Sequence, residues 1–382
     1  MKISEFCLLN GTSLKKNEGE GGYLYLDTAN ITNGVVDSFQ KYSSYADLPS
    51  RARRKVANNS IVYSTVRPNQ QHFGIITNPP DNLIVSTGFC VIDVDEKIAN
   101  PRYVYYYLSQ DSITKKLHAI AEQATTAYPS IKAKDLGDLE IELPDLDRQN
   151  EVAKILSSLD EKIVLNSAIN DNLFAQAKLL FDNEIANVSS IPSEWKKGTL
   201  LDIATYTNGL AMQRFRPADD EIGIPVLKIK ELRQGFCDSA SELCSTHINE
   251  EYLISDGDVI FSWSGSLLID LWGGDICGLN QHLFKLTSSE YPKWFYYLWT
   301  LHHLDRFITI AADKATTMGH IKRGDLAQAE VIIPSNDDIN RIGAAISPIV
   351  NLIIANKVES RKMAALRDKM LIKLITNAQN QS

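Results

Sequence analysis

The sequence carries one set of motifs twice, in the same order and at an offset of about 190 residues. The clearest pair is ATTAYPSIKAKDLGDLEIELP, which starts at Ala124, and ATTMGHIKRGDLAQAEVIIP, which starts at Ala315. The other matches are Asn10-Gly11 with Asn208-Gly209, NNSIVYS from Asn58 with DGDVIFS from Asp256, and PRYVYYYL from Pro101 with PKWFYYLW from Pro292. A repeat of this length predicts two domains of one fold, with the short insertions between blocks in loops.

The first part of each copy is predicted to be an α+β globular domain, because short strand-like runs alternate with Gly, Asn, Asp and Pro. The runs are GGYLYLD, SIVYSTV and GFCVIDV in the first copy and IPVLKI, DVIFSW and HLFKL in the second. An aromatic stretch follows in each copy, at residues 101–118 and 292–307, and predicts one buried amphipathic helix. We interpret its aromatic side chains as core and not as platforms for stacked bases: Tyr105, Tyr106, Tyr107, Tyr296, Tyr297 and Trp299.

The second part of each copy predicts a long helix, because apolar residues recur there at three- and four-residue steps. The positions of this seam are Val152, Leu156, Leu159, Ile163, Leu173, Ala177 and Leu180 in the first copy and Ile342, Ile346, Ile349, Ile353, Met363 and Met370 in the second. A helix of about 40 residues is about 60 Å long. Neither helix can bury its stripe alone, so we expect the two to pack as an antiparallel coiled coil.

Charge favours this pairing. Residues 145–187 contain four Lys and Arg against eight Asp and Glu, whereas residues 336–382 contain seven against four. Exposed ion pairs contribute about 0.2–1 kcal/mol each. Asn166 and Asn356 interrupt the two seams at equivalent positions, so they either form a buried amide pair that fixes register or face solvent where the seam frays. Pro348 has no counterpart in the first helix and is predicted to start or to kink the second one.

These features predict an α+β chain in four parts. Two similar globular domains, residues 1–144 and 190–335, alternate with a central helix at 145–189 and a C-terminal helix at 336–382. Such a chain has an internal two-fold symmetry, as duplex DNA has. Oligomeric DNA readers place their reading heads about one helical turn apart, ~34–36 Å. We therefore expect each domain to read one half-site, with the helices setting the gap between them.

Composition restricts the other classes of function. The net charge of −8 is a weak argument against nucleic acid, because phosphates respond to the local field within ~8–10 Å. Five scattered Cys without a C-x-x-C pair, and seven His without ligand spacing, predict neither a disulfide framework nor a metal site. No phosphate-binding loop is present, and we expect no cofactor. We find no signal peptide and no apolar run near the ~18–20 residues of a membrane span, so we expect a cytoplasmic protein.

The order of domain, helix, domain and helix resembles the specificity subunit of type I restriction–modification enzymes. The most similar phrases are ATTAYPSIKAKDL, LPDLDRQNEVAKILSSLDEKIVLNSAINDNLFAQAKLLF, IPVLKIKEL, GDVIFSWSG and GLNQHLFKL, and the resemblance covers essentially the whole chain. It implies that each globular part is a target recognition domain for one half of a bipartite site in double-stranded DNA. It also implies that the helices dock two methyltransferase subunits, and it leaves room for a translocating endonuclease subunit. Methylation and cleavage would then belong to the partners.

The first copy holds two sets of candidate DNA-binding residues. They are the basic run Arg51, Arg53, Arg54 and Lys55, and the polar loop with Arg67, Asn69, Gln70, Gln71 and His72. The basic run suits phosphates or the O6 and N7 atoms of guanine, and a solvated turn is the alternative. The loop suits base edges, since Asn and Gln match adenine and Arg matches guanine, and a plain surface loop is the alternative.

The second copy holds further candidates. They are Gln213, Arg214 and Arg216 after the Asn-Gly turn, Lys228, Lys230 and Arg233 on or after the IPVLKI strand, and Asn280, Gln281 and His282 at the start of another strand. Strand alternation places Lys228 and Lys230 on one face. The last set suits either base contact or buried hydrogen bonding. Lys132 and Lys322, the latter followed by Arg323, recur at matched positions and suit either phosphate contact or the capping of a shared turn.

Two other classes of function remain as alternatives. Pro80-Asp81 followed by Asp95-Glu96-Lys97 resembles the carboxylate and lysine pattern of Mg²⁺-dependent nucleases, but so short a pattern is weak. In the second copy, Leu, Thr and Ser stand at the positions that match Asp95, Glu96 and Lys97. Asn78-Pro79-Pro80-Asp81 resembles a methyltransferase motif without its aromatic residue, and we interpret it as a loop. A protein adaptor with a coiled-coil spacer is the non-DNA alternative.

Overall fold

The computed structural model describes the chain except residues 17, 19–20, 124–127, 239, 314–318 and 380–382. The matched ATT triplets that open the clearest repeat block therefore lie outside the described residues. The chain forms two compact units, unit 1 with Met1–Asp160 and Leu366–Ser382, and unit 2 with Glu161–Ala365. Each unit combines one globular part with segments of both long helices, and we describe each by itself.

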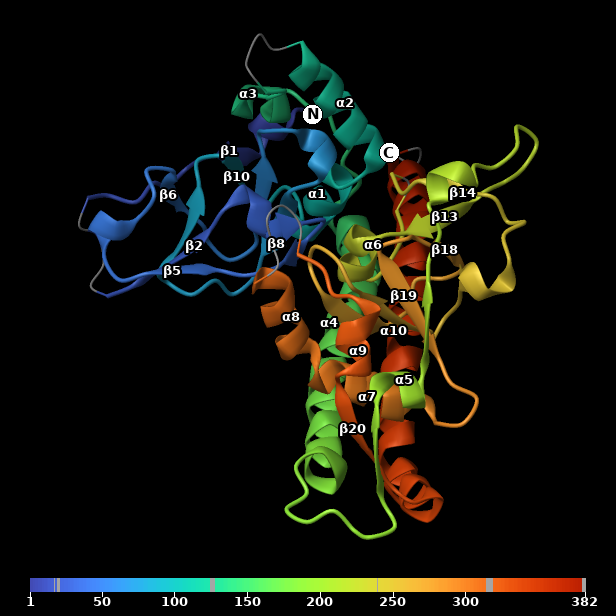
Figure 1. Cartoon of the computed structure of the whole chain (residues 1–382). Helices are drawn as coiled ribbons and strands as arrows, with labels where there is room; N and C mark the ends of the chain where they lie inside the picture. Colours follow the sequence, from blue (N-terminus) through green and yellow to red (C-terminus); the bar gives the residue numbers. More distant parts are fainter. Residues whose placement is uncertain (17, 19–20, 124–127, 239, 314–318, 380–382) are drawn as a thin grey trace. The chain divides into compact units, whose positions relative to one another are not determined.

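Unit 1 contains two four-stranded sheets (Figure 1). The antiparallel sheet has the order β1 (Cys7–Leu9), β10 (Phe89–Val94), β7 (Ser60–Ser64) and β8 (Phe73–Ile76). The mixed sheet has the order β5 (Gln40–Tyr42), β2 (Tyr23–Leu26), β9 (Leu83–Ser86) and β6 (Ala52–Lys55), with β2 parallel to β9. A small hairpin, β3 (Ile31–Thr32) with β4 (Val35–Val36), and the helices α1 (Pro101–Leu108), α2 (Asp111–Glu122) and α3 (Ala133–Gly137) complete it.

Unit 2 repeats both sheets with the same strand order. The antiparallel sheet is β12 (Thr205–Asn208), β19 (Leu283–Thr287), β16 (Val259–Ser262) and β17 (Leu268–Leu271). The mixed sheet is β14 (Leu243–Cys244), β13 (Ile224–Leu227), β18 (Cys277–Leu279) and β15 (Leu253–Ile254), with β13 parallel to β18. The other elements are β11 (Lys196–Thr199), β20 (Glu330–Ile333), α5 (Leu200–Ile203), α6 (Ile229–Gln234), α7 (Lys293–His302), α8 (Leu304–Asp313) and α9 (Arg323–Ala327). The predicted pair of α+β domains of one fold is confirmed.

The matched central strands β7 and β16 form the middle of the two cores. All five residues of β7 and all four of β16 are buried. A strand buried on both faces reads as a continuous apolar run, which is why SIVYS and DVIFS stand out in the sequence. The aromatic side chains assigned to the core are buried, from Tyr105 at 8% to Trp299 at 3% exposure.

Each aromatic stretch forms two helices, so the prediction of one continuous helix is wrong. α1 begins at the cap Asn100, whose Oδ1 accepts hydrogen bonds from Arg102 N and Tyr103 N. It ends at Leu108, because Gln110 is extended (φ −64°, ψ 140°) and starts α2 instead. In unit 2 a single residue, His303, separates α7 from α8. The apolar periodicity continues across both breaks, so it hid them.

The two long helices are α4 (Leu146–Phe181), which continues as a short π-helix over Asp182–Ala186, and α10 (Asn336–Gln379). Every predicted seam position is buried or half-buried. Within unit 2, Lys162 forms an ion pair with Glu359 and Glu184 with Arg341. Residue numbers rise along one helix and fall along the other, so the predicted antiparallel pairing is confirmed. Figure 1 shows α4 and α10 side by side.

Both seam asparagines are buried between the helices of unit 2, Asn166 at 0% and Asn356 at 8% exposure. The Nδ2 atom of Asn166 donates to Glu359 Oε2 at 2.8 Å, and that of Asn356 donates to Asn170 Oδ1 at 2.9 Å. The hydrogen bond from Asn166 and the Lys162 ammonium lower the pKa of Glu359. These amides join particular positions of α4 and α10, as a register-fixing pair would.

Two expectations for the second helix differ from the structure. Pro348 lies inside α10, which begins at Asn336, so Pro348 does not start the helix. Residues Asn336–Ile375 are also long and apolar enough to cross a membrane by length and composition, with a mean hydropathy of 1.3 in the best window, although we found no such run in the sequence. The apolar side chains Ile342, Ile346 and Val350 are at most 4% exposed within the core of unit 2. Core helices of folded domains pass the same test.

The Asn-Gly turn at Asn208-Gly209 requires glycine, which gives a testable prediction for unit 2. A Cβ atom on Gly209 would lie 2.2 Å from Asn280 O and 2.4 Å from Leu279 O, both backbone atoms. At the matched Gly11 the nearest atom is Leu8 Cδ2, at the end of a flexible side chain. We expect Gly209→Ala to lower the free energy of unfolding by about 3 kcal/mol, and Gly11→Ala by less than about 1 kcal/mol.

Urea unfolding followed by circular dichroism checks this difference. Tryptophan fluorescence isolates unit 2, because all five Trp residues lie between positions 195 and 299. Equal losses in the two variants would contradict a backbone clash at Gly209.

Candidate nucleic-acid interface

In unit 1, backbone hydrogen bonds bring three separate segments of candidate residues to one end of the sheets. Thr87 N donates to Arg51 O at 2.8 Å, and Thr65 N donates to Gly88 O at 2.8 Å. Ile131 N donates to Thr65 O at 2.8 Å, and Arg67 N donates to Pro129 O at 2.9 Å. We call Thr65, Arg67, Gly88 and Pro129–Ile131 the first junction. Lys132, which is exposed, follows Ile131 of the junction in the chain. Arg51, also exposed, accepts the bond from Thr87, the residue before Gly88 of the junction.

The rest of the basic run leads away from the first junction along β6. The Nη1 atom of Arg53 donates to Ala52 O at 2.7 Å, and its guanidinium lies 5.3 Å from the centre of the Tyr45 ring. Burial lowers the pKa of Arg54, whose side chain is half-buried. Lys55 forms an ion pair with Glu18 at 2.8 Å. The structure therefore separates Arg51 from the three residues predicted to act with it.

The predicted reading loop forms the short 3₁₀ helix η4 (Pro68–Gln70), which packs against α2. Arg67 and Gln71 flank it in the left-handed region, with φ of 48° and 55°. Asn69 and Gln70 are exposed, and Gln71 Nε2 donates to Asp111 Oδ1 at 3.4 Å. His72 Nδ1 lies 2.7 Å from Ile31 O, so that histidine is engaged by the backbone. The arginine and the three amides remain together on one exposed turn.

Unit 2 builds the same junction from matched segments. Trp263 N donates to His282 O at 3.4 Å, Ile321 N donates to Trp263 O at 3.1 Å, and Gly265 N donates to Gly319 O at 3.0 Å. We call Trp263, Gly265, His282 and Gly319–Ile321 the second junction. Lys322 and Arg323 follow it directly and are exposed, as Lys132 is in unit 1.

The remaining candidates of unit 2 surround the segment Asn280–His282. Gln281 N donates to Leu210 O, which places Gln213 and Arg214 of the turn η6 (Met212–Arg214) a few residues away. Asn280 N donates to Leu227 O at 3.2 Å. β13 ends at Leu227, so the prediction that Lys228 and Lys230 share a strand face is wrong: Lys228 caps α6 and Lys230 lies in it. Because helix α6 starts there, strand alternation stops at that point.

Ion pairs divide most of the basic candidates into two groups. Four are paired: Lys55 with Glu18, Arg216 and Lys228 with Glu242, and Lys230 with Asp238. Among the described residues no ion pair involves Arg51, Arg67, Lys132, Arg214, Lys322 or Arg323. A paired ammonium must leave its carboxylate before it can neutralise a phosphate, so the second group is better placed to contact DNA.

The recurring lysines occupy the caps of two matched helices. Lys132 N donates to Asp135 Oδ2 at 2.7 Å before α3, and Lys322 N donates to Asp325 Oδ2 at 2.7 Å before α9. The backbone amide and the aspartate make this cap, so it does not require a lysine side chain. The ammonium groups are left for another role at both positions.

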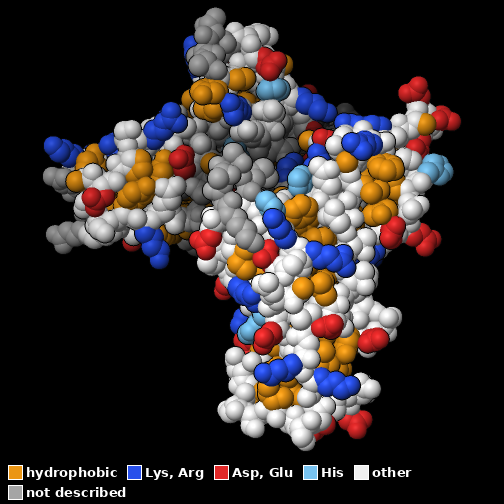
Figure 2. All heavy atoms as spheres, in the orientation of Figure 1, with side chains coloured by type: hydrophobic (Ala, Val, Ile, Leu, Met, Phe, Trp, Pro, Cys, Tyr) orange, Lys and Arg blue, Asp and Glu red, His pale blue; other side chains and the backbone are white. Residues whose placement is uncertain are grey.

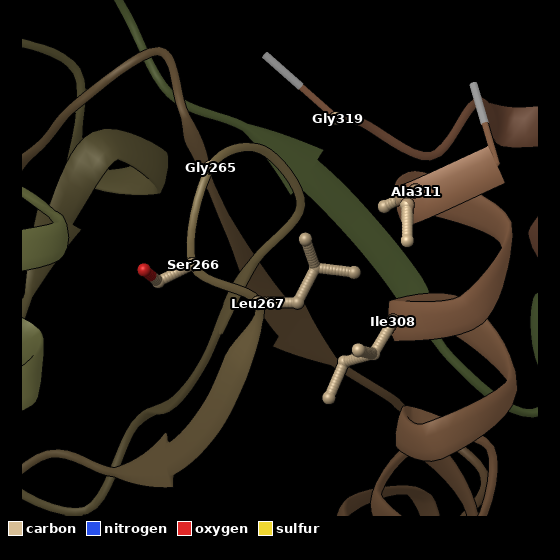
Figure 3. Close-up of a pocket in the computed structure, with 7 residues that line it drawn as sticks. Gly265, Ser266, Leu267, Ile308, Ala311 and Gly319 are labelled. Carbon is tan, nitrogen blue, oxygen red and sulfur yellow. The ribbon is translucent and has the colours of Figure 1, made fainter. Parts of the chain in front are cut away.

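The described residues give little support to a catalytic function. They contain no cluster of three His, Cys, Asp or Glu that could hold a metal. A pocket of about 340 Å³ in unit 2 is lined by Gly265, Ser266, Leu267, Ile308, Ala311, Ala312 and Gly319. Figure 3 shows Leu267, Ile308 and Ala311 pointing into it, while Ser266 points away. Among the described residues, this lining has no acidic, basic or imidazole side chain. Asn78–Asp81 lies in the loop between β8 and β9, as predicted.

Comparison of the two units adds candidate residues that the sequence analysis did not select. Lys15 and Lys16 follow Gly11 as Arg214 and Arg216 follow Gly209, and both lysines are exposed. The repeat itself was the available signal, since both basic pairs come within seven residues of an Asn-Gly turn. Trp263 and His320 carried no comparable signal, because their partners lie far away in the sequence. Figure 2 shows Lys and Arg side chains interspersed with Asp and Glu over the visible face, in keeping with the net charge of −8.

The chain therefore has two matched α+β domains, paired long helices, and a polar, partly basic junction in each domain. The family model of the type I restriction modification DNA specificity domain matches residues 1–174 and 192–362. The chain therefore belongs to that family, and both repeats are covered. DNA sequence recognition as a type I specificity subunit, predicted from the sequence, is thereby confirmed, and the nuclease and adaptor alternatives are not favoured.

Individual proteins agree with the family model. The chain is 32% identical to the HindI specificity subunit of Haemophilus influenzae over 158 residues, 41% of this chain and 34% of that one. It is 22% identical to the MjaIX specificity subunit of Methanocaldococcus jannaschii over 85% of this chain and 82% of that one. The solved structure of a type I S subunit from M. genitalium has a TM-score of 0.56 at 14% identity, covering 98% of this chain and 95% of that one, and supports the fold.

Proposed function

We propose that this chain reads a bipartite site in double-stranded DNA, with residues 1–144 as the first target recognition domain and residues 190–335 as the second. The observation that carries the proposal is the repeated fold, in which two matched junctions hold different side chains. A repeated framework with unlike side chains suits the reading of two unlike half-sites.

The long helices, residues 145–189 and 336–382, are the proposed spacer and docking surface for two methyltransferase subunits. A translocating endonuclease subunit could join the same complex. Several apolar side chains on these helices point to solvent, among them Val164 at 67% and Leu165 at 52% exposure. Exposed apolar groups on a paired helix favour a protein partner. The chain itself is proposed to carry out neither methyl transfer nor cleavage, and to act in the cytoplasm without a cofactor.

A genome-wide map of methylated bases, with the gene intact and deleted, tests this function. The expected result is the loss of one split motif, two short half-sites around a fixed gap, on deletion. An unchanged map together with binding that does not depend on salt would support the adaptor instead.

The purified chain gives an independent test. The logarithm of its association constant for duplex DNA should fall linearly with the logarithm of the salt concentration. The slope should be near −0.9 for each phosphate contacted. Cutting of DNA by the purified chain with Mg²⁺ alone would overturn the non-catalytic role and support the nuclease.

A further inference from the structure

The two junctions share a backbone framework, keep an isoleucine at Ile131 and Ile321, and differ in side chain at four other matched positions. Three backbone hydrogen bonds match in each unit. In the first, the residue after the central strand donates to the residue before the last strand of the antiparallel sheet. The other two involve the segment before the short helix, which donates one of them and accepts the other. The matched pairs are Thr65 with Trp263, Arg67 with Gly265, Gly88 with His282, and Ser130 with His320. Constant backbone with unlike side chains is what two reading sites for different bases require.

Arg67 occupies a backbone conformation that suits glycine. Its φ is 48°, and the matched residue in unit 2 is Gly265, with φ of 65°. An L-residue other than Asn or Asp is uncommon in this region and is strained there. The second copy has glycine, which adopts this φ without strain, whereas the first copy has an arginine at the same position. Such a departure is expected where the side chain itself is used.

The side chain of Arg67 is exposed and held in place. Its guanidinium lies 4.8 Å from the centre of the Tyr128 ring, and stacking of this kind restricts a flexible side chain. Five N–H donors in a planar fork match the O6 and N7 acceptors of guanine in the major groove. Lys132 lies two residues beyond Ser130 of the junction and is placed to contact a phosphate beside that base.

The second junction presents aromatic and imidazole groups in place of an arginine. Trp263 Nε1 donates to Asn208 Oδ1 at 3.0 Å, and its ring centre lies 6.0 Å from that of His282 and 6.3 Å from that of His320. Ser264 Oγ lies 3.0 Å from His282 Nδ1. All three rings are half-buried, so they have fixed orientations and remain accessible. Lys322 and Arg323 stand beside them as Lys132 stands beside Arg67.

We propose that the two junctions are the base-reading sites of the two domains, with Arg67 reading a guanine in the first half-site and Trp263, His282 and His320 reading the second half-site. This inference rests on the proposed function. It adds which residues determine specificity and which half-site each set controls.

The variant Arg67→Gly tests the first junction, because it installs the residue that the matched position already carries. The gene is replaced in the source cell, and the methylation motif is mapped again. One guanine of one half-site should become degenerate, and the purified variant should bind the original duplex about 10- to 100-fold more weakly. The midpoint of thermal unfolding should be unchanged or higher, since glycine suits the local φ.

Lys41→Met is the control, because Lys41 is an exposed cation of unit 1 that lies on the edge strand β5 and belongs to neither set of candidates. The motif should be unchanged in this variant. Conversely, the double variant His282→Ala with His320→Ala should alter the other half-site and leave the guanine in place. An intact motif in Arg67→Gly, or a change in both half-sites of a folded variant, overturns the inference.

The outcomes separate this inference from the proposed function. If the wild-type gene produces no split motif, the function itself fails. If the wild-type motif is split but Arg67→Gly and the double histidine variant leave it unchanged, the function stands and the assignment of the junctions is wrong.

Discussion

Replacing Arg51, Lys132, Lys322 and Arg323 together by alanine is expected to weaken DNA binding about 1,000-fold at ~150 mM salt. These four exposed cations adjoin the two junctions, and no ion pair holds them among the described residues. With four phosphate contacts, the association constant varies with about the −3.6 power of the salt concentration. The factor by which these contacts raise the association constant therefore increases about 1,000-fold when the salt concentration falls from ~1 M to ~150 mM. Titration of a labelled duplex at several salt concentrations measures both the loss and the change in slope.

A second set of four substitutions is the control, because it removes the same charge. Lys55, Arg216, Lys228 and Lys230 are each paired with a carboxylate. Replacing them by alanine should change the slope much less, since they release fewer counterions from DNA. Similar losses in the two sets would mean that net charge, and not position at the junctions, controls binding. The contacts would then lie elsewhere on the surface.

Asp160→Ala is expected to lower the stability of unit 1 by about 3 kcal/mol. Its carboxylate accepts from Tyr106 Oη at 2.6 Å and from Arg367 Nη1 at 2.7 Å, and so joins α1, α4 and α10. Burial, and then the Asp160 carboxylate, raise the pKa of Tyr106. The Arg367 side chain is only 18% exposed. Removing one partner of a buried pair costs about 3–5 kcal/mol, and partial exposure favours the lower end.

Asp368→Ala provides the comparison, because Asp368 pairs with the same arginine but is 62% exposed. Its loss should cost less than about 1 kcal/mol. Hydrogen exchange of peptides from α1 and from residues 366–375 measures the local opening, and tryptophan fluorescence of unit 2 should not change. If Asp160→Ala and Asp368→Ala lower the stability of unit 1 by the same amount, the ion pair with Asp160 is not the contact that holds α10 in unit 1.

Local sequence patterns predicted most of the elements. The runs SIVYS and DVIFS became β7 and β16 because strands buried on both faces need continuous apolar residues. The three- and four-residue spacing of the seams gave α4 and α10. The same spacing failed at Ser109 and Gln110, where one backbone conformation breaks an otherwise unbroken pattern. Strand alternation failed at Lys228 for a related reason, since a helix begins there.

The candidate interface could be predicted in composition but not in arrangement. Arg51, Arg67 and Lys132 were each selected by residue type, yet bonds from Thr87, Thr65 and Ile131 decide that they meet. Tertiary packing also decides that Lys55 and Lys230 face carboxylates. Trp263 and His320 became candidates once a bridge between Ser264 and His320 joined segments more than 50 residues apart.

The sequence by itself determined the repeat, the α+β class, the helical seams and the family, because each of these is a pattern read along the chain. The tertiary structure decided which cations are neutralised, that Arg67 occupies the position of a glycine, and that two junctions share one framework. Those properties depend on hydrogen bonds and ion pairs between residues distant in sequence, whose partners a linear pattern does not specify.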